Sequence, residues 1–213
     1  PVFYGTNLTG GIIVDAGISN QNDTMTYAIV LGEQTDTGTF SIGDQYRGDQ
    51  KLNFGVAGSS HIVTSVTDAN ATSTNNVNGK MRCRVYAGGT AATDQIFPVN
   101  VANRVAATTM LSTITATTSY EGLIFAVFQL DYDPEEGLTG LGQYTAEITN
   151  SLSEPGAVLS DYLLNARYGA GLTTAELDTT SIAAVTAYAT EQVDFTNTVG
   201  TTAQHDRWAI NGM

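Results

Sequence analysis

The densest group of side chains that could do chemistry is acidic and falls within residues 131–136, read DYDPEE. Alternate carboxylates at Asp131 and Asp133, followed by Glu135 and Glu136, supply the oxygen ligands that Ca²⁺ prefers. The segment lacks the remaining ligand spacing of a calcium-binding loop, and such short patterns often match by chance. We therefore predict a solvated turn here, with no metal and no cofactor.

Two histidines and one cysteine are the other side chains that could act as base, nucleophile or metal ligand. His61 and His205 stand in polar stretches far apart, where we expect both to be exposed, and nucleophilic catalysis needs a base that a third group orients. Cys83 alternates with Arg82 and Arg84 on an expected strand, so both arginines should point to the opposite face. A lone cysteine excludes an intrachain disulfide. We expect Cys83 to be a buried hydrophobic residue, and no enzyme activity.

Two further stretches superficially resemble binding motifs. Residues 137–142, GLTGLG, have the glycine content of a nucleotide-binding loop, but no strand-to-helix switch surrounds them and no lysine is present, so we predict a flexible hairpin loop. Trp208 could stack on a sugar, but its alternating surroundings predict a core residue. A carbohydrate-binding or carbohydrate-active β-rich protein remains an alternative, which the Thr, Asn and Gly content suits. It would need paired catalytic carboxylates or an aromatic platform, and the sequence offers one Trp and no convincing acid pair.

The best-defined element is a predicted helix in residues 154–172, EPGAVLSDYLLNARYGAGL. Pro155 suits the first helical turn, where its missing N–H would have no partner anyway. Arg167 is expected in the last turn, where a cation meets the negative end of the helix dipole. Gly169 and Gly171 permit a left-handed helix end. The predicted apolar face, at three- and four-residue spacing, consists of Val158, Leu159, Tyr162, Leu163 and Ala166.

The remaining pattern predicts an α+β protein, mostly antiparallel, with a second helix at residues 181–193 after a capping-box sequence at 173–176. In the strand 24–33 we expect Met25, Tyr27, Ile29 and Leu31 to share one face. Residues 57–79 look weakly ordered, and residues 101–117 permit either a short helix or a strand. The predicted strands are 2–4, 11–15, 24–33, 39–42, 51–54, 80–86, 122–132, 143–150 and 207–213.

Charge and chain ends restrict the function further. Charged residues make up only 14% of the 213 residues, yet the formal net charge is −13. Binding to nucleic acid phosphates needs clustered Lys and Arg, so such a surface is not expected. A passage through which DNA slides without sticking would suit this charge, and plain solubility explains it equally well. No apolar run reaches the length of a membrane span. Because the chain opens on Pro1 and closes in an expected strand, we interpret it as a piece of a longer polypeptide.

Three stretches resemble the central tail-hub and tip-attachment (host-specificity) proteins of long-tailed bacteriophages. They are the opening run of residues 1–35, the strand–loop–strand at 125–148, and the segment 154–171. The resemblance covers roughly residues 1–35 and 120–213, and Asp161 to Gly171 is its most specific part. Glu154 and Gly156 depart from the Asn and Ala of the family pattern. The residues that carry the resemblance in the helical segment are Pro155, Asp161, Tyr162, Leu163, Asn165, Arg167, Tyr168, Gly169 and Gly171.

This resemblance implies a β hub-type domain at residues 1–150 with two short helices packed on it. Residues 57–118 could be an insertion, and residues 151–213 a helical segment leading into a further β domain. It implies a structural virion protein at the distal end of a phage tail, a homotrimer that contacts tail-tube proteins and tail fibre or spike proteins. DNA would pass through without specific binding. Arg167 and Tyr168 are expected to hold the helix end against adjacent strands. The acidic loops expected to face the channel lie at Asp36, Asp44, Asp49, Asp68, Asp94 and 131–136.

Overall fold

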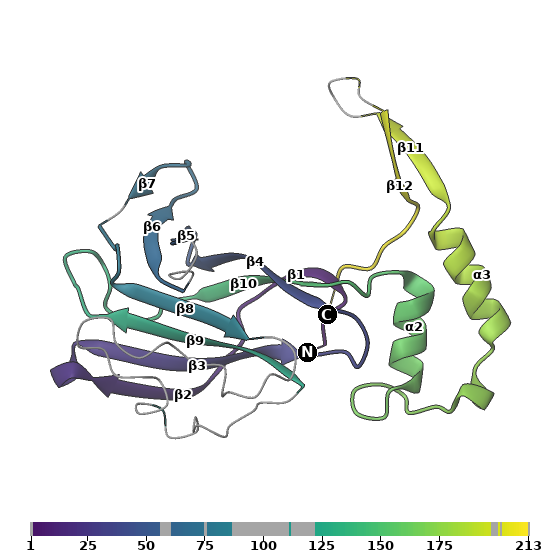
Figure 1. Ribbon diagram of the computed structural model, residues 1–213, viewed down its shortest axis with the longest axis horizontal. Helices are drawn as coiled ribbons and strands as arrows, with labels where there is room; N and C mark the ends of the chain where they lie inside the picture. The colour runs from purple at the N-terminus through teal and green to yellow at the C-terminus, as the bar shows by residue number, and fades with distance from the viewer. Residues whose placement is uncertain are drawn as a thin grey trace. The chain divides into compact units, whose positions relative to one another are not determined.

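The computed structural model describes residues 2–55, 61–74, 76–86, 111, 122–196, 200 and 202–212. Within them the chain is an α+β protein of mostly antiparallel strands with two α-helices, which confirms the predicted fold class (Figure 1). It divides into two compact units that alternate along the sequence. The first unit consists mainly of Leu8–Gln34 and Ile42–Ile148, and the second of Val2–Asn7, Thr35–Ser41 and Thr149–Met213.

A four-stranded antiparallel sheet lies in the first unit. Its order is β2-β3-β9-β8, and the short 3-10 helix η1 (Asn20–Asn22) connects β2 to β3. The central strand β9 is buried from Ile124 to Leu130, so burial on both faces extends along nearly the whole strand. Gln129 is buried as well, in the interior strand of the sheet between β3 and β8. The strands are β2 (Ile12–Ser19), β3 (Thr24–Glu33), β8 (Met81–Tyr86) and β9 (Leu123–Asp131).

Strand β3 has the predicted bounds, and the face that carries Met25, Tyr27, Ile29 and Leu31 is buried only in its second half. Ile29 and Leu31 are buried, whereas Met25 and Tyr27 are half-buried. The opposite face of β3, an interior strand paired with both β2 and β9, is buried at the start of the strand. The buried residues of that face are Thr24, Thr26 and Ala28.

A six-stranded sheet has the order β1-β10-β4-β5-β6-β7. Strand β10 turns its predicted apolar face inward, with Tyr144, Ala146 and Ile148 buried. Residues 43–47, predicted to be a connection, lie within β4, and β6 and β7 lie within the stretch predicted to be weakly ordered. Residues 101–117 fall outside the described residues apart from Leu111. The strands are β1 (Gly5–Thr9), β4 (Phe40–Arg47), β5 (Gln50–Phe54), β6 (Val63–Thr67), β7 (Ser73–Thr74) and β10 (Tyr144–Asn150).

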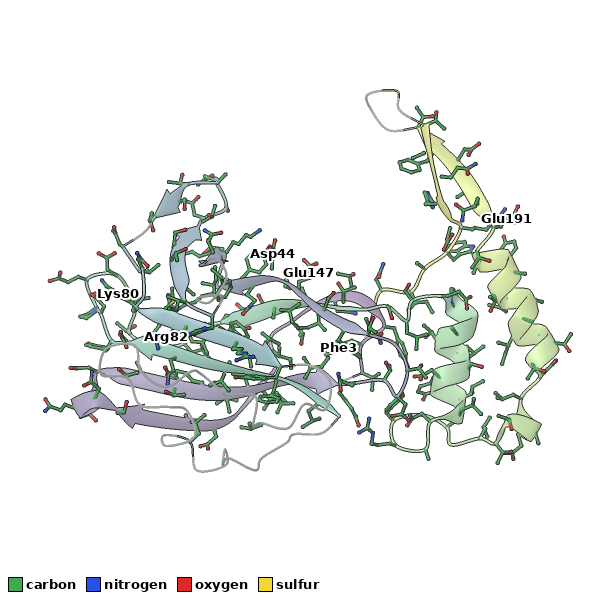
Figure 2. The ribbon with its side chains drawn as sticks, viewed as in Figure 1. Phe3, Asp44, Lys80, Arg82, Glu147 and Glu191 are labelled. Carbon is green, nitrogen blue, oxygen red and sulfur yellow. The ribbon has the colours of Figure 1, made fainter. Side chains whose placement is uncertain are left out.

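The two sheets meet in the first unit around Tyr144. The Phe128 ring lies 5.5 Å from the Tyr144 ring in an edge-to-face arrangement, and Cys83 Sγ lies 3.3 Å from Tyr144 Oη. Burial raises the pKa of the Cys83 thiol to about 12, so it stays protonated, as expected of a buried hydrophobic residue. Its neighbour Arg82 is buried on β8 (Figure 2), although arginine is rarely buried.

The second unit contains the helices and a hairpin. Helix α2 (Pro155–Leu164) ends five residues before Gly169, and helix α3 (Thr179–Ala189) ends four residues before Val193, so both predicted helices are too long at their C-terminal ends. The predicted capping box is present at the 3-10 helix η2 (Thr174–Glu176). Strands β11 (Gln192–Thr196) and β12 (Thr202–Asp206) form an antiparallel hairpin. No helix of the described residues is long and apolar enough to cross a membrane.

The end of the chain differs from its prediction. Residues 207–211 form no strand, and Gly212 makes only an isolated bridge to Tyr4. Trp208 is 59% exposed and therefore does not lie in the core. Alternation of residue types predicts a strand only where a partner strand is present to pair with its backbone groups.

Candidate functional site

The motif segment is shaped by Asn165, which ends helix α2. Its backbone is extended rather than helical, with φ −71° and ψ 124°, and its side chain is buried. The Oδ1 atom accepts hydrogen bonds from the backbone N–H groups of Arg167 at 2.8 Å and Tyr168 at 3.1 Å. This local pairing competes with the helix for the backbone donors, so the helix ends before the expected position.

Gly169 is required because the turning chain passes close to helix α2. A Cβ atom at this position would lie 1.8 Å from the backbone oxygen of Tyr162. The same oxygen accepts a hydrogen bond from the Ala170 N–H at 2.9 Å, and Leu163 O accepts one from Leu172 N–H at 2.8 Å. The motif positions Tyr162 and Leu163 thus act through their backbone oxygens.

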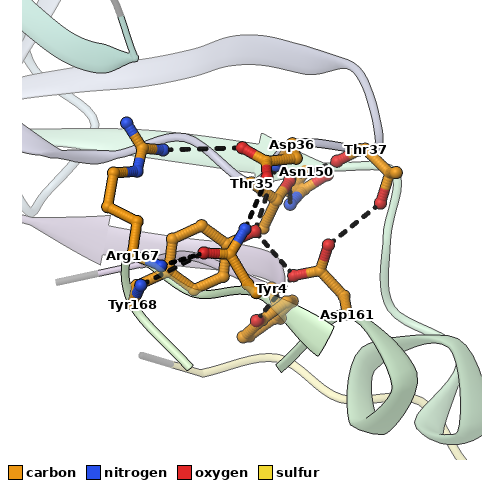
Figure 3. Close-up of polar contacts among 9 residues, drawn as sticks. Tyr4, Thr35, Asp36, Thr37, Asn150, Asp161, Arg167 and Tyr168 are labelled. Atoms are coloured by element: carbon orange, nitrogen blue, oxygen red, sulfur yellow. Dashed lines mark hydrogen bonds and ion pairs between the residues drawn. The ribbon is translucent and has the colours of Figure 1, made fainter. Parts of the chain in front are cut away.

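Asp161 joins three segments of the second unit. Its Oδ2 atom accepts hydrogen bonds from Tyr4 Oη at 2.9 Å and from Tyr168 Oη at 2.8 Å, and its Oδ1 accepts one from Thr37 Oγ1 at 3.2 Å (Figure 3). Tyr4 belongs to the opening run, and Thr37 to the segment Thr35–Ser41. A single carboxylate therefore fixes the helix, the N-terminal segment and the turn after the helix to one another.

Asp36 adds a second set of contacts to the same cluster. Its backbone N–H donates to Tyr168 Oη at 3.0 Å, and its Oδ2 accepts from Asn165 Nδ2 at 2.5 Å. Arg167 Nη2 stands 3.7 Å from Asp36 Oδ1, and its guanidinium lies 5.6 Å from the Tyr168 ring centre. Because the Arg167 and Asp36 side chains are 47% and 67% exposed, water screens this ion pair. Tyr168 and Asn165 therefore make the firmer contacts.

The two phenols of the cluster are hydrogen-bond donors rather than acids. Burial, together with its hydrogen bond to Asp161, raises the pKa of Tyr168 to about 12. Burial also raises the pKa of Tyr4 well above its ordinary value, and the Asp161 carboxylate raises it further. Both hydroxyls remain protonated at neutral pH, which suits a structural role and not proton transfer.

A hollow of about 360 Å³ lies beside the cluster, within the second unit. Its apolar lining consists of Leu152, Ala157 and Leu164, and both carboxylates of the cluster, Asp36 and Asp161, also line it.

The N-terminal end of helix α2 is held by contacts within the second unit. Pro155 occupies the first helical position, and both Glu154 carboxylate oxygens accept backbone N–H groups, from Gly156 and Ala157, each at 2.7 Å. Glu154, which departs from the family pattern, therefore caps the helix in place of the expected Asn. Of the predicted apolar face, Val158 is buried, whereas Leu159 and Tyr162 are exposed.

Sequence reasoning missed Tyr4, Asp36 and Asn150. Asn150 Nδ2 donates to Phe3 O at 2.8 Å and to Thr35 Oγ1 at 2.9 Å, and Asn150 is fully buried. A signal existed for Asn150, because it continues the inward register of Tyr144, Ala146 and Ile148. A polar residue at an inward position must find internal hydrogen bonds. No pattern in the sequence pairs Tyr4 or Asp36 with the helix.

The acidic segment 131–136 forms a turn around Asp133. Lys80 Nζ lies 2.5 Å from Asp133 Oδ2, and this contact is the main reason that the pKa of Asp133 lies below its ordinary value. Asp133 Oδ1 also accepts the backbone N–H groups of Glu135 at 3.2 Å and Glu136 at 3.3 Å. Where residues are described, no group of three or more His, Cys, Asp or Glu side chains is placed to hold a metal ion.

Arg47 gives the glycine-rich loop a structure that the sequence did not indicate. Its guanidinium donates to three backbone oxygens, at 3.1 Å to Gly137, 2.9 Å to Gly140 and 3.1 Å to Leu141. Leu138 and Leu141 are buried. The loop is therefore anchored to β4 and does not resemble a phosphate-binding loop.

The histidines have different environments. His205 is exposed, as expected, and its ring lies 5.0 Å from that of Phe195. His61 is buried, contrary to expectation, and burial followed by the nearby charge of Arg82 lowers its pKa.

Comparisons with known proteins add no family to this geometry. The chain matches no protein-family model and no curated protein sequence. The resemblance to phage tail-hub proteins therefore stays a prediction from the residues.

Proposed function

We propose that this chain is a structural virion protein, the hub or tip that closes a phage tail tube at its distal end and anchors fibre or spike proteins for host attachment. The resemblance in residues 1–35 and 120–213 suggests the family. The structural observation that supports an assembly role is the apolar surface of strand β2. The Asp161 cluster supports a structural rather than a chemical role for the motif, because its donors and acceptors hold segments together.

Strand β2 lies at one edge of the four-stranded sheet and is exposed on both faces (Figure 1). Ile12 is 70% exposed and Ile18 63% exposed, and Ile13 and Val14 between them are also exposed. An edge strand offers backbone donors and acceptors to another chain, and a long hydrophobic edge is usually protected by charge or cover. β2 carries one charged residue, Asp15. This strand is thus suited to being covered on assembly.

We propose a second copy of the chain as the occupant of this surface. Copies that each carry a formal net charge of −13 repel one another, so a nearly neutral strip such as β2 is suited to their contact. The opposite edge strand, β8, already receives His61 O, which accepts the Cys83 N–H at 2.8 Å. β2 would therefore meet a different patch of its neighbour. Such head-to-tail contacts form a closed ring when the rotation between copies closes, as a homotrimer on the tail axis requires.

The acidic surplus supports passage of DNA without binding. Asp49 and Glu135 are exposed, and Asp44 is paired with Lys51 at 2.6 Å. Asp68 accepts the backbone N–H groups of Asn70 and Thr72, each at 2.9 Å, within its own turn. Asp94 lies outside the described residues. With 21 acidic and 8 basic residues, a channel lined by this chain would offer DNA phosphates few attractive contacts.

Oligomeric state tests this proposal. Native mass spectrometry of the chain should detect a trimer, and the double change Ile12→Lys and Ile18→Lys should convert it to a monomer by placing two charges on the apolar strip. Val185→Lys is the matched control, since Val185 is also exposed but lies on α3. A monomer at all concentrations, a sixfold assembly, or a trimer that the β2 changes leave intact would contradict the proposed ring contact.

A carbohydrate-binding protein is the second candidate, because aromatic side chains are exposed near the hairpin. Trp208, Tyr188 and Phe195 all have large exposed fractions. Arg207 stacks on Tyr188 with its guanidinium 4.6 Å from the ring centre, which leaves Trp208 as the main candidate for stacking on a sugar. Retardation of the chain in gels containing a panel of polysaccharides, lost in Trp208→Ala, would favour this candidate over the tail hub.

A further inference from the structure

The hollow in the second unit combines an apolar floor with two carboxylates. Leu152, Ala157 and Leu164 supply the apolar lining, and Asp36 and Asp161 stand at the same hollow of about 360 Å³. The lining comes from α2 and from the two segments beside it. The hollow is thus part of one compact unit, and the Asp161 cluster fixes its walls.

The charge of these carboxylates is poorly compensated. Asp161 accepts hydrogen bonds from three hydroxyl groups, those of Tyr4, Thr37 and Tyr168, and none of these donors is a cation. Asp36 faces one cation, Arg167, at 3.7 Å, and this pair is largely in water. The hollow therefore keeps a negative potential. The hydroxyl groups hold the carboxylates in place but do not neutralise their charge.

This combination selects one class of occupant. Lysine and arginine side chains have an apolar stem and a charged head, so the stem can cover apolar surface while the head meets a carboxylate. An anion would be repelled, and a purely apolar group would cover the carboxylates without replacing their contacts with water, which is costly. A metal ion would need more oxygen ligands than two carboxylates provide.

We propose that this hollow is a docking site for a lysine or arginine side chain of a partner polypeptide. The stem lies on Leu152, Ala157 and Leu164, and the cationic head lies between Asp36 and Asp161. The site does not depend on the ring contact at β2 or on the tail-hub function, because all of its lining residues belong to the second unit of one chain.

The probe for this site is n-butylguanidinium, which reproduces an arginine side chain, followed by amide resonances in nitrogen–proton correlation spectra. Saturable shifts are expected at Thr37, Ala157 and Ser160, which line the hollow. The neutral probe n-butanol and the anionic probe pentanoate should produce much smaller shifts. Affinity for n-butylguanidinium should fall as salt rises, because part of the attraction is electrostatic.

Two variants separate the apolar and the charged contributions. Ala157→Leu should abolish binding by filling the hollow, and Ala184→Leu on an exposed position of α3 is the matched control. Asp36→Asn keeps an acceptor for Asn165 but removes one charge, and should weaken binding about threefold, the effect of one exposed ion pair.

The outcomes are distinct. Absence of saturable shifts, equal shifts with n-butanol, or binding that Ala157→Leu leaves unchanged would each overturn the docking site. A protein that binds n-butylguanidinium as expected but is monomeric would uphold the site while contradicting the ring contact.

Discussion

Tyr4, Thr37 and Tyr168 all use the Asp161 carboxylate as the acceptor for their hydroxyl groups. The Tyr4 side chain is buried, so its hydroxyl has little access to water as a substitute partner. A buried polar group left without a partner costs about 1–3 kcal/mol. Asp161 is accordingly the residue on which the arrangement of the second unit depends most.

We predict that Asp161→Ala lowers the free energy of unfolding by about 1–3 kcal/mol, because it leaves the Tyr4 and Tyr168 hydroxyls without their acceptor. Urea denaturation measures this change. Asp49→Ala removes the same charge from an exposed position and should have almost no effect. Equal effects of the two changes would show that charge, and not the hydrogen bonds of Asp161, determines the loss.

Urea denaturation also compares the contribution of Arg167 to stability with that of Asp161. Its ion pair with Asp36 is long and exposed, so Arg167→Ala should cost less than about 1 kcal/mol. The sequence predicted that Arg167 and Tyr168 together hold the helix end. In the structure Tyr168 and Asn165 make shorter contacts than the Arg167 ion pair.

Alkaline pH should weaken the same cluster. The pKa of Tyr168 is raised from 10.0 to about 12 in the folded state, and that of Tyr4 is raised further. Between pH 10 and about 12 the folded protein binds more protons than the unfolded chain, so the free energy of unfolding falls as pH rises. We predict that the two tyrosine hydroxyls contribute their full stabilisation below pH 10, and that this stabilisation is lost progressively from pH 10 to about 12.

The measurement is the urea midpoint as a function of pH. The double variant Tyr4→Phe and Tyr168→Phe lacks both titrating groups, and its midpoint should fall less steeply over this range. A wild-type midpoint that stays level above pH 10 would contradict the hydrogen bonds to Asp161.

At the scale of elements, the end of helix α2 depends on a close approach of backbone to backbone. We predict that Gly169→Ala destabilises the protein by about 1–3 kcal/mol, because a Cβ atom would collide with the Tyr162 oxygen at 1.8 Å and the turn would have to move. Gly140→Ala is the control, since a Cβ atom there meets no atom within 4 Å. Equal melting temperatures for the two variants would contradict the proposed packing of the turn.

Local patterns predicted the elements better than their ends. Strand β3 has the bounds that its alternating residues indicated, and the central strand β9 lies within the predicted strand 122–132. The end of α2 was missed because Ala166 and Arg167 suit a helix, while the Asn165 side chain takes the backbone donors instead. The helix predicted at 181–193 similarly ran into strand β11, whose partner β12 lies further along the chain.

The candidate site was predictable only in part. Asp161, Asn165 and Tyr168 belong to the motif segment, but their partners Tyr4 and Asp36 lie more than a hundred residues earlier in the chain. Contacts of such sequence separation leave no periodic signal in a single sequence. The contacts of Arg47 with the 137–142 loop were missed for the same reason.

At the scale of the whole molecule, the surface combines a large net charge with exposed apolar strips, as expected of a protein that assembles with others. The chain carries a formal net charge of −13, yet β2 presents four large aliphatic side chains with one charge among them. Its hairpin and the residues after it expose further aromatic side chains. These surfaces lie on both units, so we expect each unit to have its own contacts within a particle.

The central claim is that the chain lies at the distal end of a phage tail. Immunogold electron microscopy of phage particles that contain this chain tests it most directly, with antibodies raised against residues 192–206, whose strands β11 and β12 are largely exposed. Gold particles should lie at the end of the tail opposite the capsid. Gold on the capsid or spread along the tube, or no gold on particles in which mass spectrometry detects the chain, would contradict the tail-hub function.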